Sequence, residues 1–193
     1  MRKQKKNRTA LWMGLFVVFI MVASTFAFIY SYNADTTLTY NGIKFKQDVQ
    51  TGAYSAKIDK QLYQFFYHPT AVESFALDAA AIPALKNAQA IAVTFDPNAN
   101  QQQLLYVDGF RFELEKYVNK QVYSAVINES SIYPFAVFTC DNATAQIPVI
   151  YLNDSFEPSF IYENNCLIVN AKGIDLLAMR DRVLYGYLGV ING

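Results

Sequence analysis

Histidine, glycine and cysteine are scarce in this sequence, and each scarcity excludes a class of chemistry. The chain has one histidine, His68, so a Ser-His-Asp triad could use only that residue. Its 8 glycines form no G-x-x-x-x-G-K and no G-x-G-x-x-G motif, which leaves little scope for a loop that cradles phosphate. The 2 cysteines form no C-x-x-C pair, which argues against thiol exchange. We therefore predict no catalytic residues, no cofactor and no bound metal.

Charged residues are also few, at 17% of the chain, and they are unevenly distributed. From Asp35 onward the chain carries 11 bases against 16 acids, a net charge of −5. A mildly acidic domain without a basic run is a poor candidate for nucleic-acid binding, and we predict none. Five bases precede the first acid: Arg2, Lys3, Lys5, Lys6 and Arg8.

One long apolar run dominates the N-terminal part of the sequence. Residues 10–30 contain no charge and no proline, and as a helix they would be about 31 Å long, the thickness of a bilayer core. We predict a transmembrane helix here that binds the lipid bilayer. Excess Lys and Arg mark the cytoplasmic side, so the N-terminus is expected inside and the remaining chain outside. The alternative is a signal peptide cleaved near Val22-Ala23-Ser24, which would also place the domain outside the cytoplasm.

The predicted organisation is therefore a short basic segment, an anchor and one domain. We assign residues 1–9 to a cytoplasmic segment, 10–30 to the transmembrane helix, 31–37 to a linker and 38–193 to an extracytoplasmic domain. The length of that domain is close to the commonest single-domain size. The chain is 53% hydrophobic and 16% aromatic, which rules against disorder.

The periodicity of the domain predicts an α+β fold. Residues 38–67 read as a β-meander with strands over 38–47, 53–58 and 61–67. Asn41-Gly42, Thr51-Gly52 and Asp59-Lys60 are candidate turns or bulges. Residues 90–95 predict a strand, the apolar spacing after Asn100 predicts an amphipathic helix to about residue 119, and residues 121–128 predict a second strand. Strand, helix and strand within this length form a βαβ unit of two parallel strands.

The last third of the chain predicts further strands and a C-terminal helix. Gly173 opens this helix, and Arg180, Asp181 and Arg182 interrupt its apolar face. Together with the βαβ unit, these elements predict a mixed β-sheet. The expected strands are residues 134–140, 147–152, 160–162 and 166–170, and a short helix is expected over 83–88.

The two cysteines, Cys140 and Cys166, both lie beyond the predicted anchor. An oxidising compartment and an even count favour a disulfide between them. Two buried free thiols are an alternative, and metal ligation with His68 and carboxylates is another.

Three N-glycosylation acceptor sequences also fall in the predicted outer domain. They are centred on Asn128, Asn142 and Asn153, all in expected turns.

The remaining catalytic and metal motifs are weak. Residues 96–107 begin like a calcium loop, but Gln101 and Val107 stand where that loop needs glycine and glutamate, so we expect a helix-entry turn instead.

A hydrolase whose acids converge only in the fold stays possible, with His68 and Asp141 as the first residues to test. The preferred hypothesis is a non-enzymatic, membrane-anchored accessory or binding protein of the cell envelope, with another membrane or envelope protein as partner. A pilin-like subunit is weaker because the processing site and early acid are missing.

Several short motifs resemble those of uncharacterised archaeal single-pass membrane-anchored proteins, across most of the outer domain. The resemblance implies a cell-surface location and no particular activity. The motifs are Phe66-Tyr67-His68-Pro69, Leu85-Lys86-Asn87-Ala88, Thr94-Phe95-Asp96-Pro97, Thr139-Cys140-Asp141-Asn142-Ala143-Thr144, Pro148-Val149-Ile150, Asn165-Cys166-Leu167-Ile168-Val169 and Asp181-Arg182-Val183-Leu184-Tyr185-Gly186.

Overall fold

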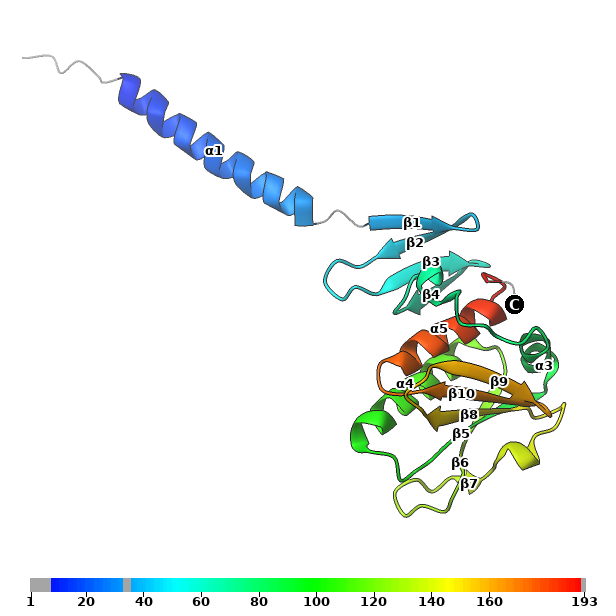
Figure 1. Cartoon of the computed structure of the whole chain (residues 1–193). Coiled ribbons are helices and arrows are strands. Elements are labelled where there is room, and N and C mark those ends of the chain that lie inside the picture. Colours follow the sequence, from blue (N-terminus) through cyan, green and yellow to red (C-terminus); the bar gives the residue numbers. More distant parts are fainter. Residues whose placement is uncertain (1–7, 33–35, 192–193) are drawn as a thin grey trace, which may run out of the picture.

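The N-terminal element is a single long helix. The computed structural model describes residues 8–32 and 36–191, and α1 covers Arg8–Tyr32 (Figure 1). Side chains of α1 are described over residues 12–26, and all of them are exposed. Over the described residues, no helix reaches the length and apolar character needed to cross a membrane. The transmembrane helix predicted over 10–30 therefore coincides with a helix, but its crossing of a bilayer stays a prediction.

A four-stranded antiparallel meander follows α1. The predicted strand over 38–47 is in fact two strands, because Asn41 and Gly42 both adopt positive φ, 47° and 78°, and turn the chain back. An Asn-Gly pair favours this two-residue hairpin turn. The strands lie in sequence order and comprise β1 Thr36–Tyr40, β2 Ile43–Gln47, β3 Tyr54–Ile58 and β4 Gln61–Phe65.

The second sheet has six strands in the order β7-β6-β5-β8-β10-β9. All neighbouring strands are parallel except β9, which pairs antiparallel with β10. The mixed sheet and the parallel βαβ unit confirm the predicted α+β class. The strands are β5 Ala90–Phe95, β6 Gln121–Val126, β7 Ala136–Val137, β8 Val149–Asp154, β9 Ser159–Glu163 and β10 Cys166–Ala171.

The helices show where the predictions hold and where they fail. Asn100 caps α4 as predicted, and α4 ends at Tyr117. The strand predicted over 134–140 is wrong for most of its length, because only the two residues of β7 pair as a strand. A 3₁₀ turn, η1 Cys140–Asn142, follows, in which Thr139 and Asn142 cap each other reciprocally. The remaining helices are α2 Pro69–Val72, α3 Ala81–Asn87, α4 Gln101–Tyr117 and α5 Asp175–Tyr187.

Helix α5 is the centre of the fold. It contacts α4 and β10 on one side, and on the other side its Tyr185 stacks on Phe65 and packs edge-on against Phe45 of the meander. Figure 1 shows α5 between the two sheets. Because α5 is covered on both sides, it has no face exposed to solvent. The charged residues 180–182, which interrupt its apolar face, are therefore buried.

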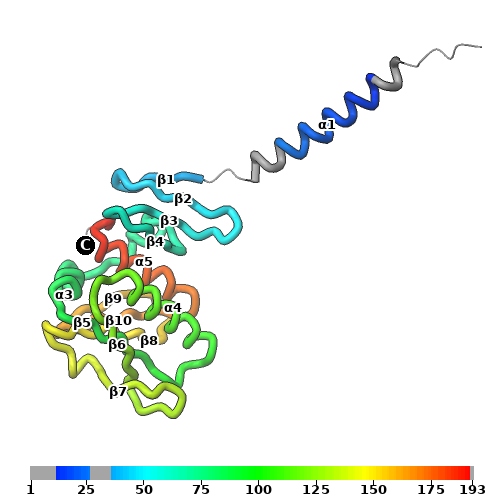
Figure 2. The backbone as a smooth tube through the Cα atoms, turned by 180° about the vertical axis from the view of Figure 1, so that it is seen from behind, coloured from blue at the N-terminus to red at the C-terminus, as the bar shows by residue number. Residues whose placement is uncertain are grey.

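The opposite face of the six-stranded sheet is covered by chain rather than by a helix. Side chains of Ala92, Val149 and Cys166 on this face are buried beneath Phe138 and neighbouring residues of the segment 138–147. This segment is the crossover from β7 to β8. The tube in Figure 2 follows the same path from behind.

Candidate functional site

The carboxyl end of the six-stranded sheet is the place where strand connections diverge. β5 continues through α4 to β6 on one side, whereas β8 continues toward β9 and β10 on the other. Open α/β sheets bind ligands in the crevice outside the carboxyl ends of such strands. Asp96 follows β5, Asp154 ends β8 and Lys172 follows β10. The carboxyl end of these strands is therefore the expected position of a ligand site.

A cleft of about 600 Å³ lies at the carboxyl end of the strands, between the start of α4 and the loop after β6. We name it the α4 cleft. Asn100 shapes one wall by accepting the N–H of Gln103 at 2.9 Å. Ser130 shapes the other, because its hydroxyl oxygen accepts the N–H groups of Ile132 and Tyr133. The lining residues are Pro97, Asn98, Ala99, Gln101, Leu104, Leu105, Asp108, Ile132 and Tyr133.

The charge in the α4 cleft is already compensated. Oδ1 of Asp108 accepts a hydrogen bond from the guanidinium of Arg111, one helical turn further on. Arg111 also donates through Nε to the hydroxyl oxygen of Ser124 on β6 at 3.0 Å. Its guanidinium carbon lies 5.4 Å from the ring centroid of Phe95 and 4.9 Å from that of Phe135. This network joins α4 to β6 beside the cleft.

The polar groups left in the α4 cleft suit binding better than catalysis. Burial and the nearby Asp108 raise the pKa of Tyr133, so its phenol stays protonated at neutral pH. The amides of Asn98 and Gln101 complete the polar lining. A Ser, Thr or Cys nucleophile beside a base, which covalent catalysis needs, is not among the residues that line this cleft.

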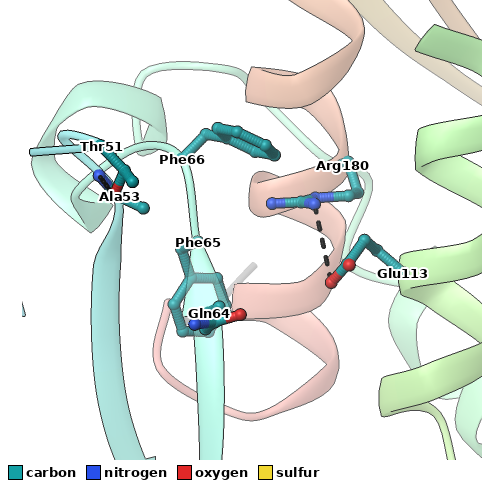
Figure 3. Close-up of a pocket in the computed structure, with 7 residues that line it drawn as sticks. All are labelled: Thr51, Ala53, Gln64, Phe65, Phe66, Glu113 and Arg180. Atoms are coloured by element: carbon teal, nitrogen blue, oxygen red, sulfur yellow. Dashed lines mark hydrogen bonds and ion pairs between the residues drawn. The ribbon is translucent and has the colours of Figure 1, made fainter. Parts of the chain in front are cut away.

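A second cleft of about 220 Å³, the α5 cleft, lies between the meander, α4 and α5 (Figure 3). Arg180 lies at its base: its guanidinium is 4.8 Å from the ring centroid of Phe66, and its Nη1 is 4.0 Å from Oε2 of Glu113. Nε of Arg180 donates to Oδ1 of Asp181 at 2.9 Å. The other lining residues are Thr51, Ala53, Gln64 and Phe65.

Asp181 connects this cluster to the backbone of the meander. Its Oδ2 accepts the N–H groups of Phe66 and Tyr67 at 2.7 and 2.8 Å. Burial raises the pKa of Asp181 to about 6, although Arg180 and these two N–H groups act in the opposite direction. Tyr185 donates its hydroxyl to the carbonyl of Tyr67 at 2.6 Å. These bonds join α5 to the chain just after β4. Arg180, Asp181 and Tyr185, which we call the α5 cluster, therefore have a structural role.

His68, the first candidate for an enzyme, is not in any cleft described above. Its ring is buried among Tyr40, Phe45 and Tyr54, with Nδ1 2.9 Å from Oγ1 of Thr70. Burial lowers its pKa, so the ring is neutral at neutral pH. A general base must reach a substrate proton, and the surrounding rings prevent that here.

Asp141, the second candidate, lies in η1 and is exposed. With Glu163 it lines a cleft of about 300 Å³ beside the disulfide. The two candidates His68 and Asp141 belong to different parts of the fold, and no cleft described here contains both. In the described part of the chain, no three His, Cys, Asp or Glu side chains are grouped closely enough to hold a metal ion.

The predicted disulfide is confirmed. Cys140 of η1 is bonded to Cys166 at the start of β10, with Cα atoms 5.3 Å apart. The bond ties the crossover segment 138–147 to the sheet face that lacks a helix. Its position gives it a structural role, and the alternatives of free thiols or metal ligation no longer apply.

The three acceptor asparagines differ in their surroundings. Asn128 is exposed in the loop after β6. Asn142 is exposed too, but its Oδ1 accepts the N–H of Thr139. Asn153 lies within β8, half-buried, and its Nδ2 donates to Oδ1 of Asn170 at 2.7 Å. The prediction that all three lie in turns is therefore wrong for Asn153.

Comparison with known proteins gives no relative for this arrangement. No protein-family model matches the chain. No curated protein and no solved structure matches it either. The resemblance to archaeal membrane-anchored proteins stays a prediction, and the function has to be inferred from the clefts and the surface.

Neither cleft was identified in the sequence. Leu105 and Ile132 lie on opposite walls of the α4 cleft, and only the βαβ crossover brings them together. The α5 cluster did leave a signal, since charges at Arg180 and Asp181 within an apolar stripe require buried partners. That signal indicates a buried ion pair but does not identify Glu113 or the backbone of Phe66 as its neighbours.

Proposed function

We propose that this chain is a single-pass, membrane-anchored accessory protein that binds another envelope protein through the α4 cleft, outside the cytoplasm and without catalysis. The observation that carries the binding role is the exposed apolar rim of the cleft. The side chains of Leu105 and Ile132 are 67% and 74% exposed on opposite walls. Apolar groups around a cleft are typical of an interaction site.

The anchoring part of the proposal rests on the sequence of residues 10–30 and on the form of α1. This stretch carries no charge, and five bases precede residue 9. α1 is one continuous helix of 25 residues, and large apolar side chains from Trp12 to Phe26 are exposed on it. An isolated helix that is apolar on all sides needs an apolar environment. The basic flank supports a cytoplasmic N-terminus.

The extracytoplasmic location is supported by the disulfide. Bonds such as Cys140–Cys166 persist in oxidising compartments and are rare in the cytoplasm. The same topology follows from the basic segment at the other end of the proposed anchor. Two independent features of the chain therefore support one orientation.

The chemistry of the α4 cleft indicates what kind of partner segment fits. Its apolar walls suit an aliphatic or aromatic anchor side chain, and its amides and the Tyr133 hydroxyl suit the backbone beside that anchor. Asp108 on its wall is already paired with Arg111. Two further acids, Asp96 and Glu129, are the sequence neighbours of Pro97, which lines the cleft, and of Ser130, which shapes its other wall. We therefore expect an apolar residue flanked by Lys or Arg on the partner.

The test is the native mass of the full chain extracted from its own membranes in detergent. Wild type should elute with a partner chain, identified by mass spectrometry. Leu105→Gln combined with Ile132→Gln should release that chain, because both apolar contacts are lost. The matched control is Ile161→Gln, which alters an exposed apolar side chain on β9.

The outcomes separate the parts of the proposal. Loss of one defined partner in the cleft variant, with retention in the Ile161 variant, supports binding through the α4 cleft. A partner retained by both variants contradicts that role of the cleft. A chain recovered without any detergent contradicts the anchor.

A further inference from the structure

The α5 cleft contains two opposite charges that contact each other only loosely. Nη1 of Arg180 lies 4.0 Å from Oε2 of Glu113, which is longer than a hydrogen bond. The other carboxylate oxygen of Glu113 lies 3.8 Å from Nζ of Lys116, which is again too long. Among residues 8–32 and 36–191, neither Nη1 nor the Glu113 carboxylate has a hydrogen-bond partner. Both groups can therefore hydrogen-bond a ligand without giving up a bond within the protein.

The guanidinium of Arg180 is held in one orientation by its other contacts. Nε and Nη2 both donate to Oδ1 of Asp181. The guanidinium carbon lies 4.8 Å from the ring centroid of Phe66. Figure 3 shows the guanidinium between this ring and the carboxylate of Glu113. A donor that is already fixed in place loses little conformational freedom when a ligand binds it.

The charges around the α5 cleft balance at neutral pH. Arg180 and Lys116 are the cations, and Asp181 and Glu113 are the anions. A ligand with a carboxylate alone would face the like charge of Glu113, and a ligand with an ammonium alone would face that of Arg180. A ligand that carries both charges close together avoids both repulsions and makes both attractive contacts.

The size and the apolar walls of the cleft limit the rest of the ligand. Its volume of about 220 Å³ is below the ~300 to 1,000 Å³ of pockets for drug-sized molecules. Phe66 is 50% exposed, so part of its ring is open to contact. Ala53 and Phe65 add apolar surface, and the amide of Gln64 adds a polar group. The cleft therefore fits a small molecule with a short apolar part.

We propose that the α5 cleft binds a free α-amino acid. Its carboxylate accepts a hydrogen bond from Nη1 of Arg180, its ammonium donates to the carboxylate of Glu113, and its side chain packs on Phe66. The walls come from the meander and from helices α4 and α5, so a bound amino acid connects these parts and stabilises the fold. The site depends neither on the proposed anchor nor on the α4 cleft.

The experiment is isothermal titration calorimetry of the full chain in detergent at pH 7.5 with glycine, L-leucine and L-phenylalanine. The tightest binder is then compared with its amide, which lacks the carboxylate, and with the matching acid, which lacks the amino group. For L-leucine these analogues are L-leucinamide and 4-methylpentanoate. We expect at least one of the three amino acids to bind, and each analogue to bind about tenfold more weakly or worse, because one charge-assisted hydrogen bond is lost.

Glu113→Gln tests the two contacts separately, because it removes the partner of the ammonium and also the charge that repels a carboxylate. We expect the amino acid to bind this variant about tenfold more weakly, and the acid without the amino group to bind it at least as well as wild type. Glu115→Gln makes the same charge change at an exposed position of α4 and should alter neither affinity. Arg180 is left intact, since its loss would leave Asp181 buried without a counter-charge.

Hydrogen exchange gives the location of the bound amino acid. Saturating amino acid should slow exchange at the end of β4, around Gln64 and Phe65, which line the α5 cleft. The variant Leu105→Gln with Ile132→Gln, in the α4 cleft, should retain the same affinity.

The proposal is overturned if none of the three amino acids binds, or if both analogues bind as tightly as the amino acid. Equal weakening of the amino acid and the deaminated acid by Glu113→Gln also overturns it, because that result indicates a distorted cleft rather than a lost ammonium contact. Slower exchange confined to residues 97–108 would place the amino acid in the α4 cleft and overturn it too. None of these results bears on the membrane partner, whose release is measured separately.

Discussion

The side chains of Arg180 and Asp181 form an ion pair that solvent does not reach. They are 1% and 0% exposed, and Nε of Arg180 is 2.9 Å from Oδ1 of Asp181. Such a pair need not stabilise a fold relative to apolar residues, but a single buried charge without its partner is costly. The pair therefore gives a sharp test of the joint between α5 and the meander.

Arg180→Met should destabilise the protein by about 3 to 5 kcal/mol at neutral pH, because Asp181 is then buried without a counter-charge. Urea unfolding followed by circular dichroism measures this. Lys116→Met is the control, since Lys116 is an exposed residue of α4, and it should change the free energy of unfolding by about 0.5 kcal/mol or less. Combining Arg180→Met with Asp181→Asn should recover most of the loss, because the asparagine is neutral and its amide oxygen can still accept the N–H groups of Phe66 and Tyr67. An Arg180→Met variant as stable as wild type would contradict the expected cost of an unpaired buried charge.

His68 should make folding stability sensitive to mild acid. Burial lowers its pKa below 6.5, with Glu73 acting weakly in the opposite direction. The unfolded chain takes up a proton at the ordinary pKa and the folded chain resists, so the contribution of His68 to the free energy of unfolding is lost as pH falls below about 6.5. Unfolding of wild type and His68→Asn between pH 7.5 and 5 should show a steeper loss in wild type.

Titration of Asp181 changes the free energy of unfolding with pH in the opposite direction to titration of His68. The pKa of Asp181 is raised to about 6, so its contribution is present below about 4 and is lost as pH rises through 6. Because wild type and the His68 variant both retain Asp181, its contribution cancels in their difference. Parallel pH profiles for the two proteins would show that His68 titrates as it does in the unfolded chain.

The sequence predicted the elements whose signals are local. β5 and α4 fall where the apolar run, the turn cluster and the Asn100 cap place them, because each signal acts within a few residues. The disulfide was predicted from the even count of cysteines together with the predicted oxidising compartment, and the bond is confirmed. In contrast, the strand order of the larger sheet and the burial of α5 on both sides depend on packing between distant segments.

The same distinction explains why the clefts were missed. The α4 cleft has Leu105 and Ile132 on facing walls. The spacing of residues along the sequence does not show which distant side chains face one another in the fold. Residues 134–140 were predicted as a strand from composition, yet β7 is short because capping at Thr139 and Asn142 competes with extended pairing.

Removal of the disulfide should destabilise the fold by about 3 to 4 kcal/mol in the chain-entropy model, since it closes a long loop. We expect the combined variant Cys140→Ala and Cys166→Ala to show this in urea unfolding. Hydrogen exchange should locate the change in segment 138–147, which the bond ties to the sheet, and leave α4 protected. Labelling of both thiols in unreduced wild type would contradict the bond.

The acceptor asparagines should differ if the chain is produced in a secretory host that attaches N-glycans. Asn128 is exposed and should be modified, whereas Asn153 should not, because its amide donates to Asn170 within a sheet. The measurement is the mass lost on enzymatic deglycosylation. Asn128→Gln should lower it and Asn153→Gln should not; a glycan on Asn153 would mean that this strand is modified before it folds.

Two glycines should respond in opposite directions to the same change. A Cβ on Gly186 of α5 would lie 2.9 Å from Cγ1 of Ile82, a core residue of α3. Gly186→Ala should therefore lower the free energy of unfolding by about 1 to 3 kcal/mol, because the core is overpacked. A Cβ on Gly109 of α4 would meet no atom within 4 Å. Gly109→Ala should therefore stabilise the protein by about 0.5 to 1 kcal/mol, because alanine favours a helix interior.

Thermal and urea unfolding of the two alanine variants measure this pair. Each variant is the other's control, since the chemical change is identical and only the neighbourhood of the new methyl group differs. A stabilising Gly186→Ala would mean that α3 moves away from α5 without cost, and the contact between Ile82 and Gly186 could then not hold α3 in place. The opposite signs are expected because α5 is enclosed between two sheets, whereas α4 has an open side.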